Sequence, residues 1–281
     1  MAIDIKIRPA GKNDFSELAN FLSFEYFVHR HLDWRSSLDW LGHQPFLIAE
    51  KESEIVATLA SPPDIPSVAW IRLFACNAFV DKSLIWDELF NQSLKNYGDE
   101  VNLIAALVMD KWFYKLLTSN KFDVYQEIIV MEWNQKIPSI SGHQKDYLIR
   151  RMEYEDLPAV LTLDHLSFPP LWQLSTADLK NAYLNSGYAS IIEIDGRILA
   201  YQISTESLSS AHLARLAVHP DIRGKLIGSY IMHDMLIHFT KKNIYRITVN
   251  TQNDNFASQN LYTKFGFLNT RENYPIMTFQ P

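Results

Sequence analysis

The sequence predicts an α+β protein built from two consecutive copies of one fold, each a mixed, mostly antiparallel sheet with helices on both faces. Three observations lead to this prediction. The second half of the chain repeats the first, both halves show the same order of strand-like and helix-periodic segments, and Asp195-Gly196 stands between two β-rich runs as a hairpin turn. The repeat sets the number of domains, and the order of the segments sets their class.

The repeat consists of four short matches in the same order. The matched pairs are IKIRPAGKNDF with YLIRRMEYEDL (from residues 5 and 147), AEKESEIVA with IEIDGRILA (49 and 192), WIRLFACN with LARLAVHP (70 and 213), and KLLTSNKF with NLYTKFGF (115 and 260). The offset drifts only from 142 to 145 residues. One such match carries little weight, but four in the same order at nearly the same offset predict a duplicated domain.

The elements of the second half can be placed in chain order. We expect strands at 147–152, 189–194, 197–204, 211–218, 244–250 and 267–279, and helices at 155–166, 175–185, 228–241 and 255–265. The strand at 211–218 is apolar and runs into the turn signal His219-Pro220-Asp221, after which an apolar-periodic helix begins. Asn255 suits the start of the last helix and Gly266 its end. The first half has the same element order.

A polar stretch separates the halves. QKIPSISGHQK, at 135–145, carries the proline and glycine typical of a linker. We therefore expect a first domain at 1–136, a linker at 137–145 and a second domain at 146–281.

Composition narrows the class of protein. With 47% hydrophobic and 21% charged residues, the chain has an ordinary globular composition, and its net charge of −6 argues against a nucleic-acid-binding protein. The single cysteine, Cys76, leaves no internal disulfide and fits a reducing cytoplasm. The charged N-terminus has no signal-peptide core, and the longest apolar stretch is too short to span a bilayer. We expect a cytoplasmic protein with no membrane partner.

One segment, RLAVHPDIRGKLIG (215–228), has the features of a diphosphate site. An apolar strand leads through a basic, glycine-bearing loop to a helix N-terminus, where free backbone N–H groups attract anions. Gly224 and Gly228 allow the backbone to approach a ligand closely, and Arg223 and Lys225 add positive charge. The alternative is an ordinary helix start after a Pro-Asp turn.

This segment resembles the acetyl-CoA-binding core of the GNAT acetyltransferase superfamily, whose loop pattern is Q/R-x-x-G-x-G/A. Arg223 and Gly228 match the first and last positions, whereas Leu226 stands where glycine is usual. A second resemblance follows about thirty residues later, to the signature N-x-x-A/S-x-x-L-Y-x-K-x-G-F. It is matched by Asn255, Ser258, Leu261, Tyr262, Lys264, Gly266 and Phe267. Two pieces in the right order and spacing are more specific than either alone.

The resemblance implies roles for these residues. The backbone of Leu216, Ala217 and Val218 would pair with the pantetheine arm of acetyl-CoA. The backbone N–H groups of the loop would hold the pyrophosphate; the loop comprises Arg223, Gly224, Lys225, Leu226, Ile227, Gly228 and Ser229. Asn255 would steady the pantetheine or cap the last helix, and Tyr262 would protonate the departing thiolate or serve as a core residue.

The general base and the acceptor site are less defined. Four residues on central strands or nearby loops could accept the amine proton: Asp164, Glu193, Glu206 and His212. We select His212 and Glu193, although a buried histidine satisfied by its neighbours, or a base acting through water, remains an alternative. Phe168, Leu171 and Trp172, in a loop stiffened by two prolines, would either wall the acceptor site or pack in the core.

The first half lacks this chemistry. Where the second half reads HPDIRGKLIG, the first reads NAFVDKSLIW, with no glycine, an acidic Asp81 and a bulky Trp86. Leu117 replaces Tyr262. His29 and His31 do not predict a metal site, because no tight cluster of further ligands follows. We expect a degenerate copy and no metal.

Two main functions remain open, with modification of a protein or ribosome as a weaker third. The first is an acetyl-CoA-dependent N-acetyltransferase with one site in the second half, acting on a primary amine of a small molecule or peptide, as monomer or homodimer. The second is a non-catalytic acyl-CoA-binding or regulatory module. Catalytic turnover separates the two.

Overall fold

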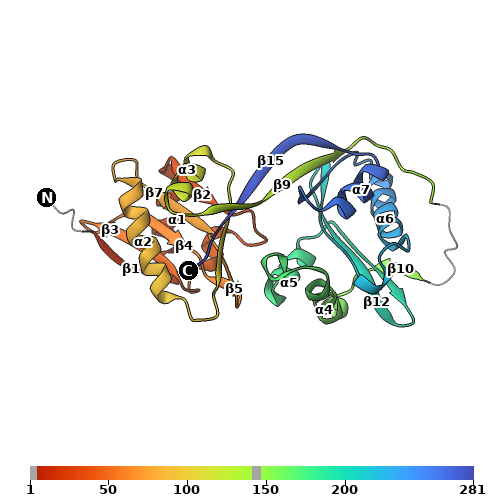
Figure 1. Ribbon diagram of the computed structural model, residues 1–281, viewed down its shortest axis with the longest axis horizontal. Helices are drawn as coiled ribbons and strands as arrows, with labels where there is room; N and C mark the ends of the chain where they lie inside the picture. Colours follow the sequence, from red (N-terminus) through yellow and green to blue (C-terminus); the bar gives the residue numbers. More distant parts are fainter. Residues whose placement is uncertain (1–4, 141–146) are drawn as a thin grey trace. The chain divides into compact units, whose positions relative to one another are not determined.

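The computed structural model describes residues 5–140 and 147–281, which form two compact units. The N-terminal unit comprises Met1–Tyr125 and Tyr274–Pro281, and the C-terminal unit comprises Gln126–Asn273 (Figure 1). Each is an α+β unit of largely antiparallel strands flanked by helices, which confirms the fold class expected from the sequence. No helix of the described residues is long and apolar enough to cross a membrane.

The C-terminal unit follows the predicted order of elements closely. It contains β10 (Leu148–Arg151), α4 (Leu157–Ser167), α5 (Thr176–Leu184), β11 (Tyr188–Ile194), β12 (Arg197–Glu206), β13 (Ser210–Val218), α6 (Ile227–Lys241), β14 (Arg246–Gln252), α7 (Phe256–Lys264) and most of β15 (Phe267–Phe279), with short 3-10 turns η3 (Tyr154–Asp156), η4 (Pro170–Trp172) and η5 (Pro220–Ile222). The strands pair in the order β10-β11-β12-β13-β14-β9, and only β13 and β14 are parallel. The β11–β12 hairpin turns at Asp195 and Gly196, both at positive φ, as a two-residue turn of this type requires.

The N-terminal unit repeats this plan with one departure from the expected order: β2 and η2 stand where the C-terminal unit has η4 and α5. It contains β1 (Lys6–Pro9), α1 (Phe15–Phe24), β2 (Phe27–Arg30), β3 (Phe46–Lys51), β4 (Glu54–Ala60), β5 (Pro63–Ile65), β6 (Val68–Trp70), β7 (Leu73–Cys76), α2 (Lys82–Asn96), β8 (Leu103–Leu107), α3 (Lys111–Ser119) and the start of β9 (Asp123–Trp133), with 3-10 turns η1 (Lys12–Asp14) and η2 (Ser37–Trp40). Its strands pair as β1-β3-β4-β7-β2 and as β15-β8-β6-β5. The parallel pair β6–β8 corresponds to the parallel pair β13–β14.

The last strand of each half completes the sheet of the other unit. Residues 128–132 of β9 pair with β14, and residues 276–279 of β15 pair with β8. The division expected from the sequence, at 1–136 and 146–281, therefore differs from the compact units at both strands. Of the expected linker at 137–145, residues 141–145 lie outside the described part of the chain.

A cluster of one arginine and two carboxylates occurs in both units, so the repeat is also visible in the side chains. Arg8 binds Asp14 at 2.8 Å and Glu50 at 2.6 Å. In the C-terminal unit, Arg150 binds Asp156 at 2.7 Å and Glu193 at 3.0 Å. In both units the cluster ties the first strand to the turn before the first helix and to the hairpin that follows.

Helices cover both faces of each sheet and create separate apolar layers. In the C-terminal unit, α6 and α7 lie on one face with a core that includes Met232, Phe239 and Tyr262, whereas α4 and α5 lie on the other face (Figure 1). In the N-terminal unit, α2 and α3 cover an aromatic core on one face and α1 covers the opposite face. This arrangement lets a strand present its backbone at an edge while its side chains face two different layers.

The buried imidazole of His29 should make the stability of the N-terminal unit depend on pH. The side chain is fully buried, it stacks on Phe113 with ring centroids 4.0 Å apart, and its Nε2 donates to the Ile71 carbonyl at 3.2 Å. Burial lowers its pKa from 6.5 to about 4. Since the unfolded chain takes up a proton between these values and the folded chain does not, acidification from pH 6.5 to pH 4 should lower the free energy of unfolding by about 3 kcal/mol through this group.

Urea denaturation at several pH values tests this expectation. His29→Phe should reduce, without abolishing, the fall in stability on acidification, because it removes one of two histidines of this unit whose pKa burial lowers; His31 is the other. His43→Phe is the matched control, since His43 is exposed. Equal pH slopes for the wild type and His29→Phe would contradict the prediction.

Candidate active site

The N-terminus of α6 is an uncapped helix end. Leu226 occupies the N-cap position and makes no side-chain hydrogen bond to the first turn. Gly224 lies in the preceding loop at φ +79°, and nothing lies within 4 Å of the place where a side chain would begin. Leu226 itself adopts the left-handed conformation at φ 62°, which explains why glycine suits this position and why a leucine here is strained. The free N–H groups and the helix dipole favour an anion.

The corresponding helix of the N-terminal unit is capped by its own carboxylate. Asp81 accepts hydrogen bonds from the backbone N–H groups of Ser83 at 2.9 Å and Leu84 at 3.1 Å. The carboxylate takes the position in which an anionic ligand would satisfy the helix end. The two units therefore differ in whether this end can receive a ligand.

Strand β13 presents an open edge next to α6. The His219 N–H donates to the carbonyl of Leu199 in β12 at 2.8 Å. In an antiparallel ladder, every second residue of a strand is hydrogen-bonded to the neighbouring strand. Ala217 therefore bonds with β12, whereas Leu216 and Val218 direct their N–H and C=O groups away from it. We call the backbone of Leu216–Val218 the open edge.

The open edge exists because β13 and β14 separate. Their parallel pairing covers Ser210–Leu213 with Arg246–Val249 and ends there. At the same point, Ser204 pairs with Leu213 and Ile203 with Arg215, so Ala214 is the extra residue of a β-bulge. The bulge redirects β13 and leaves its last residues available for an extended ligand.

In the N-terminal unit the same edge is occupied by the chain itself. Strand β2 pairs antiparallel with β7, placing Phe27 opposite Cys76 and His29 opposite Phe74. The Asn77 N–H bonds to the Val56 carbonyl at 2.8 Å, so Phe74 and Cys76 are the residues whose backbone faces β2. The segment of the C-terminal unit that corresponds to β2 contains Pro169 and Pro170, which cannot donate to a ladder, and forms η4 instead.

Strand pairing corrects the alignment of the repeat in this region. The letters WIRLFACN and LARLAVHP match best at an offset of 143, whereas the hydrogen bonds to the preceding strand match Asn77 with His219, an offset of 142. Phe74 therefore corresponds to Leu216, and Leu73 to Arg215.

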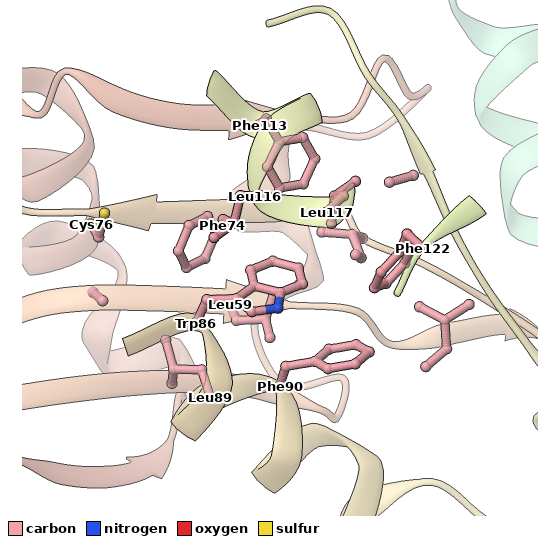
Figure 2. Close-up of a cluster of buried hydrophobic side chains, with 14 of the residues drawn as sticks. Leu59, Phe74, Cys76, Trp86, Leu89, Phe90, Phe113, Leu116, Leu117 and Phe122 are labelled. Atoms are coloured by element: carbon pink, nitrogen blue, oxygen red, sulfur yellow. The ribbon is translucent and has the colours of Figure 1, made fainter. Parts of the chain in front are cut away.

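Aromatic rings fill the remaining space in the N-terminal unit. Trp86 stands where Gly228 stands in the C-terminal unit, and Phe113 stands where Ser258 does. Figure 2 shows the Trp86 indole packed beside Phe74 and Phe113, with ring centroids 4.9 and 6.0 Å away. At Gly228, by contrast, an added Cβ would lie 3.3 Å from Leu261 and 3.6 Å from Val218. The small residue keeps α6, α7 and β13 close without a side chain between them.

Helix α7 carries the predicted acid and begins at the predicted cap. The Asn255 side chain caps the helix by accepting from the Ser258 N–H at 3.2 Å, which supports the capping interpretation. Tyr262 is 6% exposed and packs within the core of this face. Burial raises the pKa of its phenol to about 12, so the hydroxyl keeps its proton at neutral pH. Gly266 follows the helix at φ +87°, where a Cβ would meet Asn134 at 2.3 Å.

The four candidate bases have different surroundings. Glu193 belongs to the repeated ion cluster with Arg150, Glu206 pairs with Lys242, and Asp164 is fully buried against Arg215. His212 lies on β13 just before the bulge, with Nδ1 2.8 Å from the Thr248 hydroxyl. Burial lowers the pKa of His212, so the imidazole is neutral and able to accept a proton at neutral pH.

The predicted acceptor residues lie together in one loop after α4. Leu171 is 6% exposed and packs as a core residue, whereas Phe168 and Trp172 are half-buried. We call Ser167–Ser175 the acceptor loop. A residue that the sequence analysis did not select, Arg215, donates to the Trp172 carbonyl at 2.5 Å and stacks on the Phe168 ring at 3.6 Å. The sequence did contain a signal for this residue, since an arginine within an otherwise apolar strand is unusual.

Comparison with known proteins connects this geometry to one family. Residues 157–267 match the model of the Acetyltransferase (GNAT) family. Residues 157–267 form a GNAT domain. The matched range contains the uncapped helix α6, the open edge and Tyr262.

Relatives of the GNAT domain include named acetyltransferases. A putative [ribosomal protein bS18]-alanine N-acetyltransferase of Bacillus subtilis (strain 168) is 26% identical over 130 residues, which cover 45% of this chain and 85% of that protein. An uncharacterised N-acetyltransferase of Methanocaldococcus jannaschii is 25% identical over 122 residues, covering 43% and 77% of the two chains.

Solved structures extend the likeness of fold beyond the GNAT domain. A tandem GNAT protein from the clavulanic acid biosynthesis pathway is similar over 99% of this chain and 98% of that chain, with a TM-score of 0.67 and 12% identity. A probable N-acyltransferase of Enterococcus faecalis V583 is similar over 98% of this chain and 72% of that chain, with a TM-score of 0.73 and 11% identity. Both show the fold.

Proposed function

We propose that this chain is an acetyl-CoA-dependent N-acetyltransferase that acts on a primary amine of a small molecule or peptide, with one active site in the C-terminal unit. The single observation that carries this proposal is the contrast between the two units. One offers an uncapped helix N-terminus and an open strand edge, and the other fills both with Asp81 and β2. A thioester cofactor that carries a diphosphate needs both features.

The residues present fit such a cofactor. The N–H groups at the start of α6 would hold the pyrophosphate, and the open edge would pair with the amide-bearing arm. Gly228 and Ser258 stand where the other unit has the bulky rings of Trp86 and Phe113, so no aromatic side chain occupies these two positions. Acetyl-CoA supplies an activated acetyl group as a thioester.

The chemical step assigns one proton to each of two residues. The amine nitrogen attacks the thioester carbonyl carbon, the carbon–sulfur bond breaks, and an amide and a thiol result. Neutral His212 would accept the proton that the amine loses, directly or through water. Tyr262, protonated because of its raised pKa, would donate a proton to the leaving thiolate.

A thiol-release assay tests the proposal. Purified protein should release CoA from acetyl-CoA only when an amine is present, and mass spectrometry should show the amine gaining one acetyl group. A peptide with N-terminal alanine is a suitable first probe, because the similar Bacillus subtilis protein is named for that acceptor class; small primary amines complete the panel. Binding of acetyl-CoA without transfer to any probe would instead support the non-catalytic binding module.

A further inference from the structure

A buried ion pair joins the open-edge strand to the acceptor loop. Arg215 of β13 binds Asp164 of α4 at 2.6 Å, and the two side chains are 13% and 0% exposed. The same guanidinium donates to the Trp172 carbonyl and stacks on Phe168. Arg215 therefore holds the middle and the beginning of the acceptor loop.

Asp164 holds the other end of the loop. One carboxylate oxygen accepts from the Leu174 N–H at 3.0 Å, and the other accepts from Arg215 and from the Tyr201 hydroxyl. These donors occupy the carboxylate, so Asp164 acts as a tether rather than as a base. Together the pair fixes the loop at Phe168, Trp172 and Leu174.

Strand geometry explains how this ion pair is connected to the open edge. Leu216, next to Arg215, packs toward α6 and offers its backbone at the open edge. Because side chains alternate along a strand, Arg215 faces α4 and the acceptor loop. One strand thus presents its backbone to the cofactor and this side chain to the acceptor loop.

The N-terminal unit shows that the fold does not need this ion pair. At the offset of 142, Asp164 corresponds to Leu22 of α1 and Arg215 to Leu73 of β7. Both leucines lie in the apolar core beneath α1. A buried ion pair is often no more stabilising than apolar residues in its place, so its retention in the C-terminal unit calls for a reason other than stability.

We propose that the Asp164–Arg215 pair is a positioning device that fixes the acceptor loop against β13 and thereby sets the affinity for the amine acceptor. This inference rests on the proposed function of the same site. Neither side chain touches the reacting atoms in this assignment; both act through Phe168, Trp172 and the loop backbone.

The test copies the N-terminal unit into the C-terminal one. The triple variant Asp164→Leu, Arg215→Leu, Tyr201→Phe removes both charges and the hydroxyl that would lose its acceptor. Because the N-terminal unit has Leu22 and Leu73 at the corresponding positions, the variant should fold and keep a cooperative thermal transition. We expect its acetyl-CoA affinity to stay within about twofold, while kcat/KM for the alanyl peptide falls on the order of 10- to 100-fold, mainly through KM.

Hydrogen exchange provides a second readout that needs no acceptor. Backbone amides of residues 167–175, apart from the two prolines, should exchange faster in the triple variant, whereas those of α6 should not change. Arg150→Leu is the control, because it breaks the other ion cluster of this unit and should leave loop exchange and KM unchanged. Wild-type loop protection and an unchanged KM in the triple variant would overturn the inference. Failure of the wild-type chain to bind acetyl-CoA would instead overturn the proposed function.

Discussion

Replacing Gly228 with tryptophan should abolish binding of acetyl-CoA. The variant copies Trp86 of the N-terminal unit into the close contact between α6, α7 and β13, where even a Cβ would lie 3.3 Å from Leu261. The indole would cover the open edge and the first N–H groups of α6. We expect the affinity to fall at least about 100-fold, which corresponds to about 3 kcal/mol. Isothermal titration calorimetry with acetyl-CoA measures this loss.

Two further variants make this experiment decisive. Gly98→Trp is the matched control, because nothing lies within 4 Å of a side chain at Gly98 and the residue belongs to the N-terminal unit. Ser258→Phe copies Phe113 and fills the same space from α7, which covers the case in which Gly228→Trp fails to fold. A folded Ser258→Phe that binds acetyl-CoA with wild-type affinity would show that the cofactor does not use this space.

Replacing Tyr262 with phenylalanine should lower kcat and leave acetyl-CoA affinity unchanged. The phenol is buried, and its pKa of about 12 keeps the proton in place for transfer to the thiolate. Loss of a general acid lowers the rate on the order of 100- to 1,000-fold. Because this proton stays bound across the usual assay range, Tyr262 should cause no loss of wild-type kcat up to about pH 10.

Steady-state kinetics with the alanyl peptide, together with calorimetry, separate the two effects. Tyr245→Phe serves as the control, since Tyr245 is 44% exposed. If Tyr262→Phe keeps more than a third of the wild-type kcat, the proton for the thiolate comes from elsewhere. If it loses acetyl-CoA binding, the tyrosine contributes to packing rather than to proton transfer.

Local patterns predicted most of the fold because they depend on neighbours in sequence. The hairpin at Asp195-Gly196, the helix end at Gly266 and the cap at Asn255 each follow from backbone preferences of one or two residues. The repeat likewise predicted the order of elements, except that the N-terminal unit has β2 and η2 where the C-terminal unit has η4 and α5. These features need no knowledge of tertiary contacts.

Long-range pairing could not be predicted in the same way. The sequences of β9 and β15 indicate strands but not the sheet that each strand joins, because strands of similar composition can pair with either sheet. The offset between β7 and β13 differs by one residue from the best match of the letters. Only the hydrogen bonds to the preceding strand reveal this difference. The sequence repeat aligns β2 with the acceptor loop, but only the observed strand pairing shows that β2 occupies the edge of β7.

The candidate site was predicted in part for the same reason. Motif resemblance selected the α6 loop, Asn255 and Tyr262, which the structure places at the N-terminus of α6, at the N-cap of α7 and within α7. The roles proposed for them remain predictions. Sequence reasoning missed Arg215, because the value of a buried arginine depends on Asp164, fifty-one residues away. Glu193 was selected by its position on a strand, and its ion pair with Arg150 assigns it a structural role in our proposal.

The central claim is that one of two similar units has kept its acyl-CoA site. Calorimetric titration of the purified chain with acetyl-CoA measures the number of sites directly. We predict one site per chain, which Gly228→Trp removes and which Trp86→Gly in the other unit leaves unchanged. Two sites would contradict the closed state of the β2–β7 edge, and no binding would contradict the assignment of the α6 loop and the open edge to a cofactor.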